Sequence, residues 1–203
     1  MQILSDDELH KIVLHTVQQV LGSAKPSQPA VESLKPAPIV QPATPVPTEK
    51  KTVAIGTDHG GVDLKEILKS ELTEMGYAII DCGTNTKDAV DYPDIALAVA
   101  KLVANGSAWR GVVIDGAGIG SCMSANKVPG IRAAMCYDYS TAVNSREHND
   151  ANVLTLGAGL IGVNLAKQIL KTWLATEFGG GRHAKRVEKI TAIEKLYMKE
   201  GKN

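Results

Sequence analysis

The chain has 203 residues, of which 44% are hydrophobic and 4% aromatic, and its 22 basic residues balance its 22 acidic ones. This balance gives no indication of a nucleic acid or an anionic membrane as partner. The three cysteines show no C-x-x-C pairing typical of a zinc site or a disulfide framework. Because neither a signal sequence nor an apolar run of membrane-spanning length is present, we expect a cytoplasmic protein that binds no nucleic acid and no membrane.

Residues 1–22 have the pattern of one amphipathic helix. Ser5 and Glu8 form a capping box, and Gly22 stands at the expected end. The apolar positions fall on one face at helical spacing: Leu9, Ile12, Val13, Val17, Val20 and Leu21. One helix cannot bury its own apolar stripe, so we expect it to dock on its own domain, to self-associate or to bind another protein.

Residues 23–51 are rich in proline and alanine. Seven of the nine prolines fall between Pro26 and Pro47, without periodicity. Such a composition is typical of a semi-rigid linker. The sequence therefore predicts three parts: an amphipathic helix at 1–22, a linker at 23–51 and one domain at 52–203.

The domain alternates short β-branched runs with helical stretches. The five strand-like runs lie at residues 53–56, 77–81, 111–115, 131–136 and 152–156. Strands that alternate with helices predict a parallel sheet covered on both faces. The expected fold is α/β, a Rossmann-like open five-stranded parallel sheet, and ligands of such sheets bind at the carboxyl ends of the strands.

A glycine-rich loop follows the third predicted strand, in the stretch VVIDGAGIGSCMSANK at residues 112–127. Gly116, Gly118 and Gly120 allow the backbone to turn and to bring N–H groups close to an anion. Their spacing fits neither the dinucleotide fingerprint nor the P-loop. By itself the loop is equally consistent with a tight turn between a strand and a helix.

Further polar side chains cluster near the predicted loops. They are Asp58, His59, Asp91, Tyr92, Arg146, His148, Asn149 and Asp150. Arg182, His183 and Arg186 open the last predicted helix, where guanidinium groups and the helix N-terminus suit a phosphate. Each of these residues also has a plain structural interpretation as a cap, a turn or a solvated face. Because the glycine loop, the histidines and the arginines are predicted at one edge of one sheet, we expect a single site.

Six segments in unbroken order over residues 53–199 resemble the ribose-5-phosphate isomerase B family, which includes the galactose-6-phosphate isomerase subunits. They are GTDHGG, DYPD, DGAGIG, ANKVPGIRAA, SREHNDANVLTLG and GGGRHAKRVEKI. The resemblance implies an aldose–ketose isomerase, with ribose 5-phosphate and ribulose 5-phosphate as the leading pair. It also implies proton transfer through a cis-enediolate without metal or cofactor, in sites shared between the subunits of a homodimer or homotetramer.

The resemblance also implies roles for individual residues. Asp115 stands where the family commonly has a cysteine as the catalytic base, and His148 matches the family's ring-opening histidine. Phosphate-binding positions are matched by His59, Arg182 and Arg186. The expected substrate-binding residues are Asp58, His59, Tyr92, Gly116, Ala117, Gly118, Gly120, Asn126 and Asn149, with the loop amides and Asn126 as donors to the enediolate oxygen.

The chain departs from the family pattern at several of these positions. Ser121 stands where another branch carries a glutamate base, Ala117 where many relatives carry Ser or Thr, and Gly159 where many carry a phosphate-binding arginine. An aspartate at 115 can serve as the base if partial burial raises its pKa toward neutrality. We expect Cys122 to be a packing residue. Two alternatives therefore stay open: an isomerase of a hexose or other sugar phosphate, and a non-catalytic sugar-phosphate-binding or assembly subunit.

The amphipathic helix and its linker resemble the encapsulation peptides that direct enzymes into bacterial microcompartments. The resemblance implies a shell protein as the partner of residues 1–22. The alternative is that the helix packs on its own domain or on another subunit. A long, stiff tether favours a separate partner, because a helix that only covers its own core needs no such linker.

Overall fold

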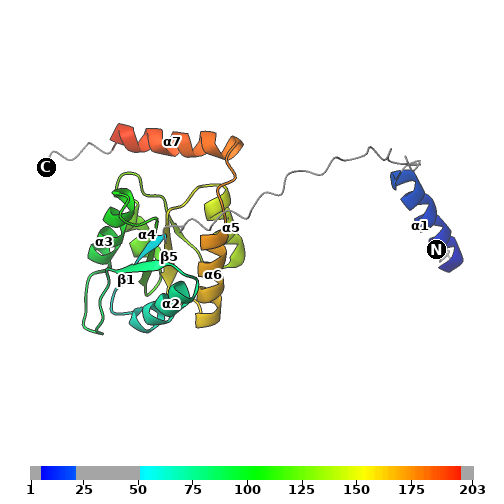
Figure 1. Cartoon of the computed structure of the whole chain (residues 1–203). Helices are drawn as coiled ribbons and strands as arrows, with labels where there is room; N and C mark the ends of the chain where they lie inside the picture. The colour runs from blue at the N-terminus through cyan, green and yellow to red at the C-terminus, as the bar shows by residue number, and fades with distance from the viewer. Residues whose placement is uncertain (1–5, 22–50, 198–203) are drawn as a thin grey trace, which may run out of the picture. The chain divides into compact units, whose positions relative to one another are not determined.

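The computed structural model describes residues 6–21 and 51–197 (Figure 1). The chain divides into two compact units, Met1–Val46 and Pro47–Asn203. The first unit contains helix α1 (Asp6–Leu21), as the periodicity predicts, and Ile12, Val13 and Val17 on it are about half exposed. Ser5 of the predicted capping box, Gly22 at the predicted helix end and the linker up to residue 50 lie outside the described residues. Within the described part of the chain, no helix is long and apolar enough to cross a membrane.

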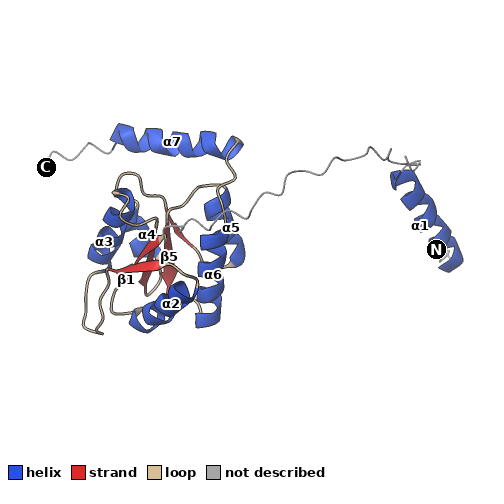
Figure 2. Cartoon of the chain, in the orientation of Figure 1, coloured by secondary structure: helices blue, strands red, loops and turns tan. Residues whose placement is uncertain are grey.

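The second unit is built on one five-stranded sheet (Figure 2). Its strands are β1 (Thr52–Thr57), β2 (Ala78–Asp81), β3 (Arg110–Asp115), β4 (Ala133–Met135) and β5 (Val153–Gly157). They lie in the order β2-β1-β3-β5-β4, and every neighbouring pair is parallel. The predicted open parallel sheet is confirmed.

A helix follows each strand. The helices are α2 (Val62–Glu74), α3 (Tyr92–Ala104), α4 (Ile119–Ala125), α5 (Tyr139–Glu147) and α6 (Val163–Ala175), and α7 (Arg182–Tyr197) is appended to them. Strand β4 is shorter than the predicted run at 131–136. Its start is displaced because the Ile131 N–H closes a turn onto the carbonyl of Val128.

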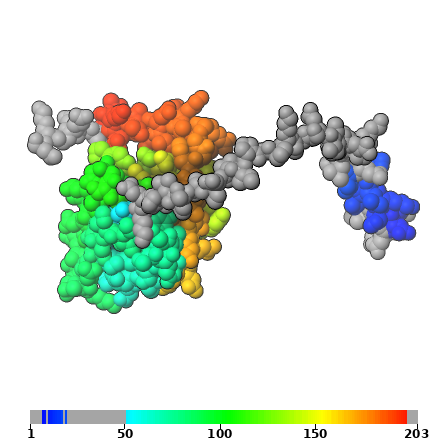
Figure 3. Space-filling model, viewed as in Figure 1, coloured from blue at the N-terminus to red at the C-terminus, as the bar shows by residue number. Residues whose placement is uncertain are grey.

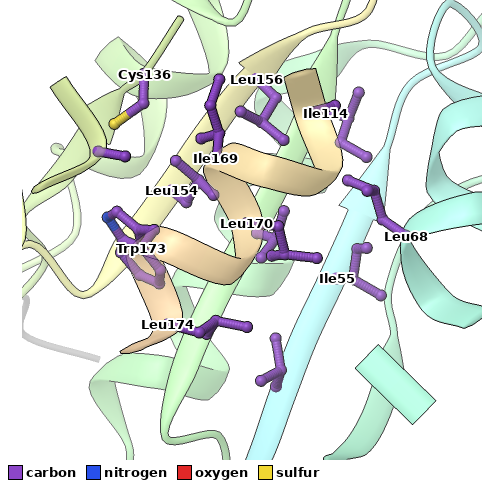
Figure 4. Close-up of a cluster of buried hydrophobic side chains, with 14 of the residues drawn as sticks. Ile55, Leu68, Ile114, Cys136, Leu154, Leu156, Ile169, Leu170, Trp173 and Leu174 are labelled. Atoms are coloured by element: carbon purple, nitrogen blue, oxygen red, sulfur yellow. The ribbon is translucent and has the colours of Figure 1, made fainter. Parts of the chain in front are cut away.

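The strands bury alternate residues on the two faces of the sheet, as the period of two requires. On one face, apolar residues of β1, β3 and β5 pack against α2, α5 and α6, with Leu68, Ile169 and Trp173 fully buried (Figure 4). On the other face, Ala54 and Val113 pack with residues of α3 and α4. The helices thus cover both faces, so binding chemistry is confined to the two edges where the loops lie.

The two edges of the sheet are chemically distinct. In parallel β-α-β units the helices run antiparallel to the strands, so each helix ends at the edge where the next strand begins. We call this the amino edge, and the edge where the strands end the carboxyl edge. Helix α7 runs along one end of the unit (Figures 1 and 3), and Glu194 on it accepts a hydrogen bond from the N–H of Gly130, in the turn between α4 and β4 at the amino edge.

A buried lysine fixes the loop that leads from β2 to α3 at the carboxyl edge. Lys65 of α2 is fully buried, and its Nζ lies 2.8 Å from both carboxylate oxygens of Asp81 and 2.7 Å from Oδ1 of Asn85. A buried charge is tolerated only when it is paired and hydrogen-bonded. These contacts therefore hold the start of this loop, at the end of which stands Tyr92.

Candidate active site

Asp115 is the last residue of β3, and the loop that follows it folds around its carboxylate. The side chain is buried, and one oxygen accepts hydrogen bonds from the N–H groups of Ala117 (2.7 Å) and Gly118. The other oxygen accepts from the N–H of Ser121 at 3.0 Å, within the first turn of α4. Asp115 therefore acts as a cap for this short helix, because the first N–H groups of a helix have no acceptor within it.

The expectation that burial raises the pKa of Asp115 toward neutrality is wrong. Burial alone raises that pKa, but the Ser121 hydroxyl and the N–H groups of Gly118, Ser121 and Ala117 lower it, and the net pKa lies below its ordinary value. The Ser121 hydroxyl is buried and makes no hydrogen bond of ordinary geometry, yet it favours the ionised carboxylate. The sequence could not show this, because the donors come from the loop conformation.

Two of the loop glycines are required by close contacts. Gly118 has a φ of 78°, and a Cβ there would lie 2.9 Å from the carbonyl carbon of Leu156. A Cβ on Gly120 would lie 2.5 Å from the ring of Tyr92. The Tyr92 ring, predicted at this site, therefore lies directly against the loop and is partly exposed beside it. This contact holds the loop against the start of α3.

The turn after β1 lies against the same loop. Asp58 is buried, and its Oδ1 accepts the N–H of Gly60 at 2.9 Å, which closes the turn. A Cβ on Gly60 would lie 3.7 Å from the backbone nitrogen of Gly116. His59 is exposed, and its Nδ1 lies 3.4 Å from the N–H of Val90. We refer to Asp58, His59, Tyr92, Asp115 and loop 116–120 as the carboxyl-edge group.

A second group of predicted residues forms around His148, the residue that ends α5. Its Nδ1 lies 2.8 Å from Nδ2 of Asn144, and its ring stacks on that of His183 with centroids 4.1 Å apart and planes inclined by 5°. Asn149 is exposed beside it, and its side chain donates to the carbonyl of Asn144. Arg182 and Arg186 of α7 are exposed next to His183. We refer to His148, Asn149, Arg182, His183 and Arg186 as the amino-edge group.

The two groups lie at opposite edges of the sheet of one chain, so the expectation of a single edge is wrong. Arg110, the first residue of β3, donates to the carbonyls of Trp173 and Leu174 at the end of α6. Arg146, near the end of α5, donates to the carbonyl of Thr176 just beyond the same helix. The end of α5, where His148 lies, is therefore at the amino edge, whereas Asp115 ends its strand at the carboxyl edge. The error came from treating a loop that follows a helix like a loop that follows a strand.

Asn126 has the contacts of a structural residue. Its Nδ2 donates to the carbonyls of Cys122 and Ala133, both at 2.9 Å, and its Oδ1 accepts the N–H of Ala133. Both amide hydrogens are thus engaged in holding α4 to β4. The prediction that Asn126 donates to an enediolate oxygen is not supported by this arrangement. The Sγ of Cys122 lies in the same contact, 3.4 Å from the carbonyl of Ala133, consistent with a packing role.

An ion network supports the backbone of the amino-edge group. Arg146 is buried and binds Asp150, which has a positive φ of 47° and also binds Arg132, with both ion pairs at 2.8 Å. Arg146 also donates to the carbonyl of Ala151. These contacts fix the backbone directly before and directly after His148 and Asn149. Arg146 and Asp150 therefore have structural contacts that support the backbone of this group.

The pairing of His183 with His148 is a feature that sequence reasoning missed. The sequence places His183 between Arg182 and Arg186 at the start of the last predicted helix, but its side chain is buried and faces another histidine. The nearest sequence signal is the run GGGRHAKR, which permits a sharp turn before α7. In the described residues, no three His, Cys, Asp or Glu side chains are placed to hold a metal ion.

Comparisons with known proteins match this fold and these motifs. The family model described as Ribose/Galactose Isomerase matches residues 53–190. The ribose-5-phosphate isomerase B of Escherichia coli is 46% identical over 144 residues, which cover 71% of this chain and 97% of that protein. The D-erythrulose-4-phosphate isomerase of Pectobacterium atrosepticum is 43% identical over 144 residues, covering 70% of this chain and 95% of that protein.

The solved structure of ribose-5-phosphate isomerase B from Clostridium thermocellum is similar as well. It superposes with a TM-score of 0.71 at 53% sequence identity, and the match covers 72% of this chain and 99% of that one. The match to the family model begins at residue 53, after residues 1–22 and the predicted linker. The second unit spans almost the whole of each relative, and the chain belongs to the Ribose/Galactose Isomerase family of aldose–ketose isomerases.

Proposed function

We propose that this chain interconverts ribose 5-phosphate and ribulose 5-phosphate in sites completed by two copies of the chain. The observation that carries the proposal is the separation of two half-sites on one chain. The carboxyl edge offers a carboxylate beside a turn of backbone amides, and the amino edge offers a histidine with two arginines. The names of the relatives from Escherichia coli and Clostridium thermocellum supply the substrate.

In this reaction Asp115 is the base at the carboxyl edge: its lowered pKa keeps it ionised and able to accept a proton, although it is a weaker base than a carboxylate with a raised pKa. It removes the proton from C2 of the open-chain aldose to form an enediolate and then delivers a proton, exchangeable with solvent, to C1, while the hydroxyl proton of O2 passes to O1. The amides of Ala117 and Gly118 are already bonded to Asp115, so they are not the donors to the enediolate oxygen. Ile119 and Gly120 lie in the first turn of α4, where backbone N–H groups have no acceptor within the helix. Their N–H groups donate to the enediolate oxygen.

His148 transfers the proton that opens the sugar ring. The imidazole is partly exposed and has Nδ1 near Asn144, so Nε2, which lies 4.0 Å from Oε1 of Glu147, is the nitrogen that meets the substrate. Arg182 and Arg186 bind the phosphate, because guanidinium groups match the geometry of phosphate oxygens. His59 of the carboxyl-edge group contributes the third phosphate contact, from the other copy of the chain.

The second copy also explains an exposed apolar face. On α7, Ile190, Ile193, Leu196 and Tyr197 are 46%, 60%, 73% and 77% exposed, respectively. Apolar side chains repeated at helical spacing and left in solvent are typical of an interface. We propose that this face of α7 packs on the second copy and brings the two half-sites together in a homodimer or a homotetramer.

A turnover assay with a panel of sugar phosphates tests the proposed function. Ribose 5-phosphate is expected to give the highest kcat/KM, with deuterium incorporated at C2 when the reaction is run in D₂O. A second candidate function is isomerisation of another sugar phosphate. It is favoured by Gly159, which has no side chain to bind a phosphate and whose N–H donates to the Gly116 carbonyl. The relative named D-erythrulose-4-phosphate isomerase makes a tetrose phosphate the first competitor to include. Absence of deuterium exchange with every sugar in the panel would leave only a binding role.

Replacing either arginine should weaken substrate binding rather than chemistry. Arg182→Ala and Arg186→Ala are each expected to raise KM for ribose 5-phosphate by about 10-fold with kcat changed by less than about 3-fold, because uniform binding is lost. Steady-state kinetics measures both constants. Lys185→Ala, which removes an exposed cation from the same helix, is the matched control and should leave KM unchanged. A KM unaffected in both arginine variants would place the phosphate elsewhere.

We also propose that α1 directs the enzyme to a microcompartment shell. The exposed Ile12, Val13 and Val17 provide an apolar face for a partner helix, and the second unit is a compact unit without this segment. Deletion of residues 1–50 should leave kcat/KM and the oligomeric mass of the domain unchanged, as measured by kinetics and light scattering. A fusion of residues 1–22 to a fluorescent protein should co-localise with shells in the native host. Inactive or unfolded truncated protein would instead assign α1 to the enzyme itself.

A further inference from the structure

The histidine beneath His148 has an unusual environment. His183 is 9% exposed, and its Nδ1 is buried without a hydrogen-bond partner. Its Nε2 lies 3.4 Å from Nε of Arg182, which can only donate. In the neutral ring Nε2 therefore accepts and Nδ1 carries the proton. A second proton on Nε2 would face a permanent cation.

The surroundings keep His183 neutral. Burial lowers its pKa, and the nearby His148, Arg182 and Arg186 lower it further, while Glu147 raises it. These are the charged and titratable groups that face the ring from α5 and α7. His148, by contrast, is partly exposed and has one nitrogen beside the Asn144 amide, which presents either a donor or an acceptor when it turns over. Of the two stacked rings, His148 is therefore the one that a ligand can reach.

The stack has the geometry of a platform. Ring centroids 4.1 Å apart with planes at 5° leave His148 flat against its neighbour, so the plane in which its Nε2 points is fixed. The neutral ring of His183 also tolerates a protonated His148 on its face, whereas a protonated His183 would repel it. The backbone supports this arrangement, because the N–H of Gly179 donates to the carbonyl of Glu147 at 2.9 Å just before α7.

We propose that His183 is a positioning residue for ring opening: its neutral ring holds the His148 imidazole in the orientation in which Nε2 exchanges a proton with the cyclic sugar. This inference rests on the proposed function, because ring opening is a step of that reaction. It differs from a phosphate-binding role for His183, since a residue that acts through His148 affects the cyclic aldose and leaves the open-chain ketose unaffected.

The chemistry of the two sugars provides the test. Ribose 5-phosphate is mainly a closed furanose, whereas ribulose 5-phosphate cannot close a five-membered ring because its C5 oxygen carries the phosphate. Turnover of the aldose therefore includes ring opening, and deuterium incorporation into C1 of the ketose in D₂O does not. The matched variants are His183→Leu, which fills the space without a flat face, and His183→Phe, which restores one.

His183→Leu is expected to lower kcat for ribose 5-phosphate by at least about 10-fold, because a misplaced catalytic group loses rate steeply. Deuterium incorporation into ribulose 5-phosphate should change by less than about 2-fold, and His183→Phe should recover kcat to within about 3-fold of the parent. Equal losses in the two assays, a rise in KM without a change in kcat, or no recovery with Phe would each overturn the proposal. If Leu unfolds the domain, the Phe variant and the parent still decide it, since a fully inactive but folded Phe variant contradicts a platform role. A parent enzyme inactive on both sugars would instead refute the proposed function.

Discussion

Asp115→Asn is expected to lower kcat by at least about 10²-fold, because general-base catalysis contributes roughly 10²–10⁴-fold. The substitution keeps the size of the side chain and removes its basicity. One of its atoms becomes an amide nitrogen, which cannot accept from the N–H groups of Ala117, Gly118 or Ser121, so some loss of loop order accompanies the loss of the base. The measurement is deuterium incorporation into ribulose 5-phosphate, which isolates proton transfer at carbon.

The control for this experiment distinguishes the loss of the catalytic base from the loss of order in the loop. Ser121→Ala removes a hydroxyl beside the carboxylate but keeps the carboxylate, and it should retain kcat within about 3-fold. Thermal unfolding of both variants measures the capping contribution. If Asp115→Asn stays active while Cys122→Ala does not, the base is the thiol.

The pH dependence follows from the lowered pKa of Asp115. A carboxyl with a pKa below its ordinary value of about 3.9 is ionised throughout the neutral range. Deuterium incorporation into the ketose should therefore be flat from about pH 5 to pH 8 and fall only in more acidic solution. Asp115→Cys should replace this profile by one that rises toward about pH 8.5, the ordinary pKa of a thiol. A parent profile with a midpoint near neutrality would contradict the assignment of Asp115.

His148→Ala is the second substitution with a large expected effect. It should reduce turnover of ribose 5-phosphate by about 10²-fold while deuterium incorporation into ribulose 5-phosphate falls by less than about 3-fold, since proton transfer during ring opening is lost and proton transfer at carbon is not. Both rates are measured by NMR in one buffer. The amino-edge position of His148 makes the effect independent of the loop around Asp115.

A matched variant tests whether the nitrogen or the ring of His148 matters. His148→Phe keeps a ring to stack on His183 and removes both nitrogens, so its loss should equal that of His148→Ala. Equal losses with aldose and ketose would remove the ring-opening role. Together with the His183 variants, this pair distinguishes proton transfer from orientation. Phenylalanine should be tolerated at position 183, where only a flat ring is needed, and not at position 148, where a nitrogen is needed.

The strands of the sheet, the helices that follow them and the residue types of the candidate site could be predicted from the amino-acid sequence. Runs such as GVVID can be buried on both faces only as strands, because alternate residues of β3 point to opposite sides. The positive φ of Gly118 likewise fits a glycine in a turn between a strand and a helix. These are local properties of the chain, so composition and spacing report them directly.

The distribution of the candidate site residues over the two edges became visible only in the three-dimensional structure. The direction of each helix places His148 at the amino edge and Asp115 at the carboxyl edge of one chain. The low pKa of Asp115 depends on backbone donors aligned by the fold, and the engagement of Asn126 depends on the packing of α4 against β4. The stack of His148 on His183 joins residues from two helices. Such contacts between distant segments are set by packing in three dimensions, and a single sequence carries no direct signal of them.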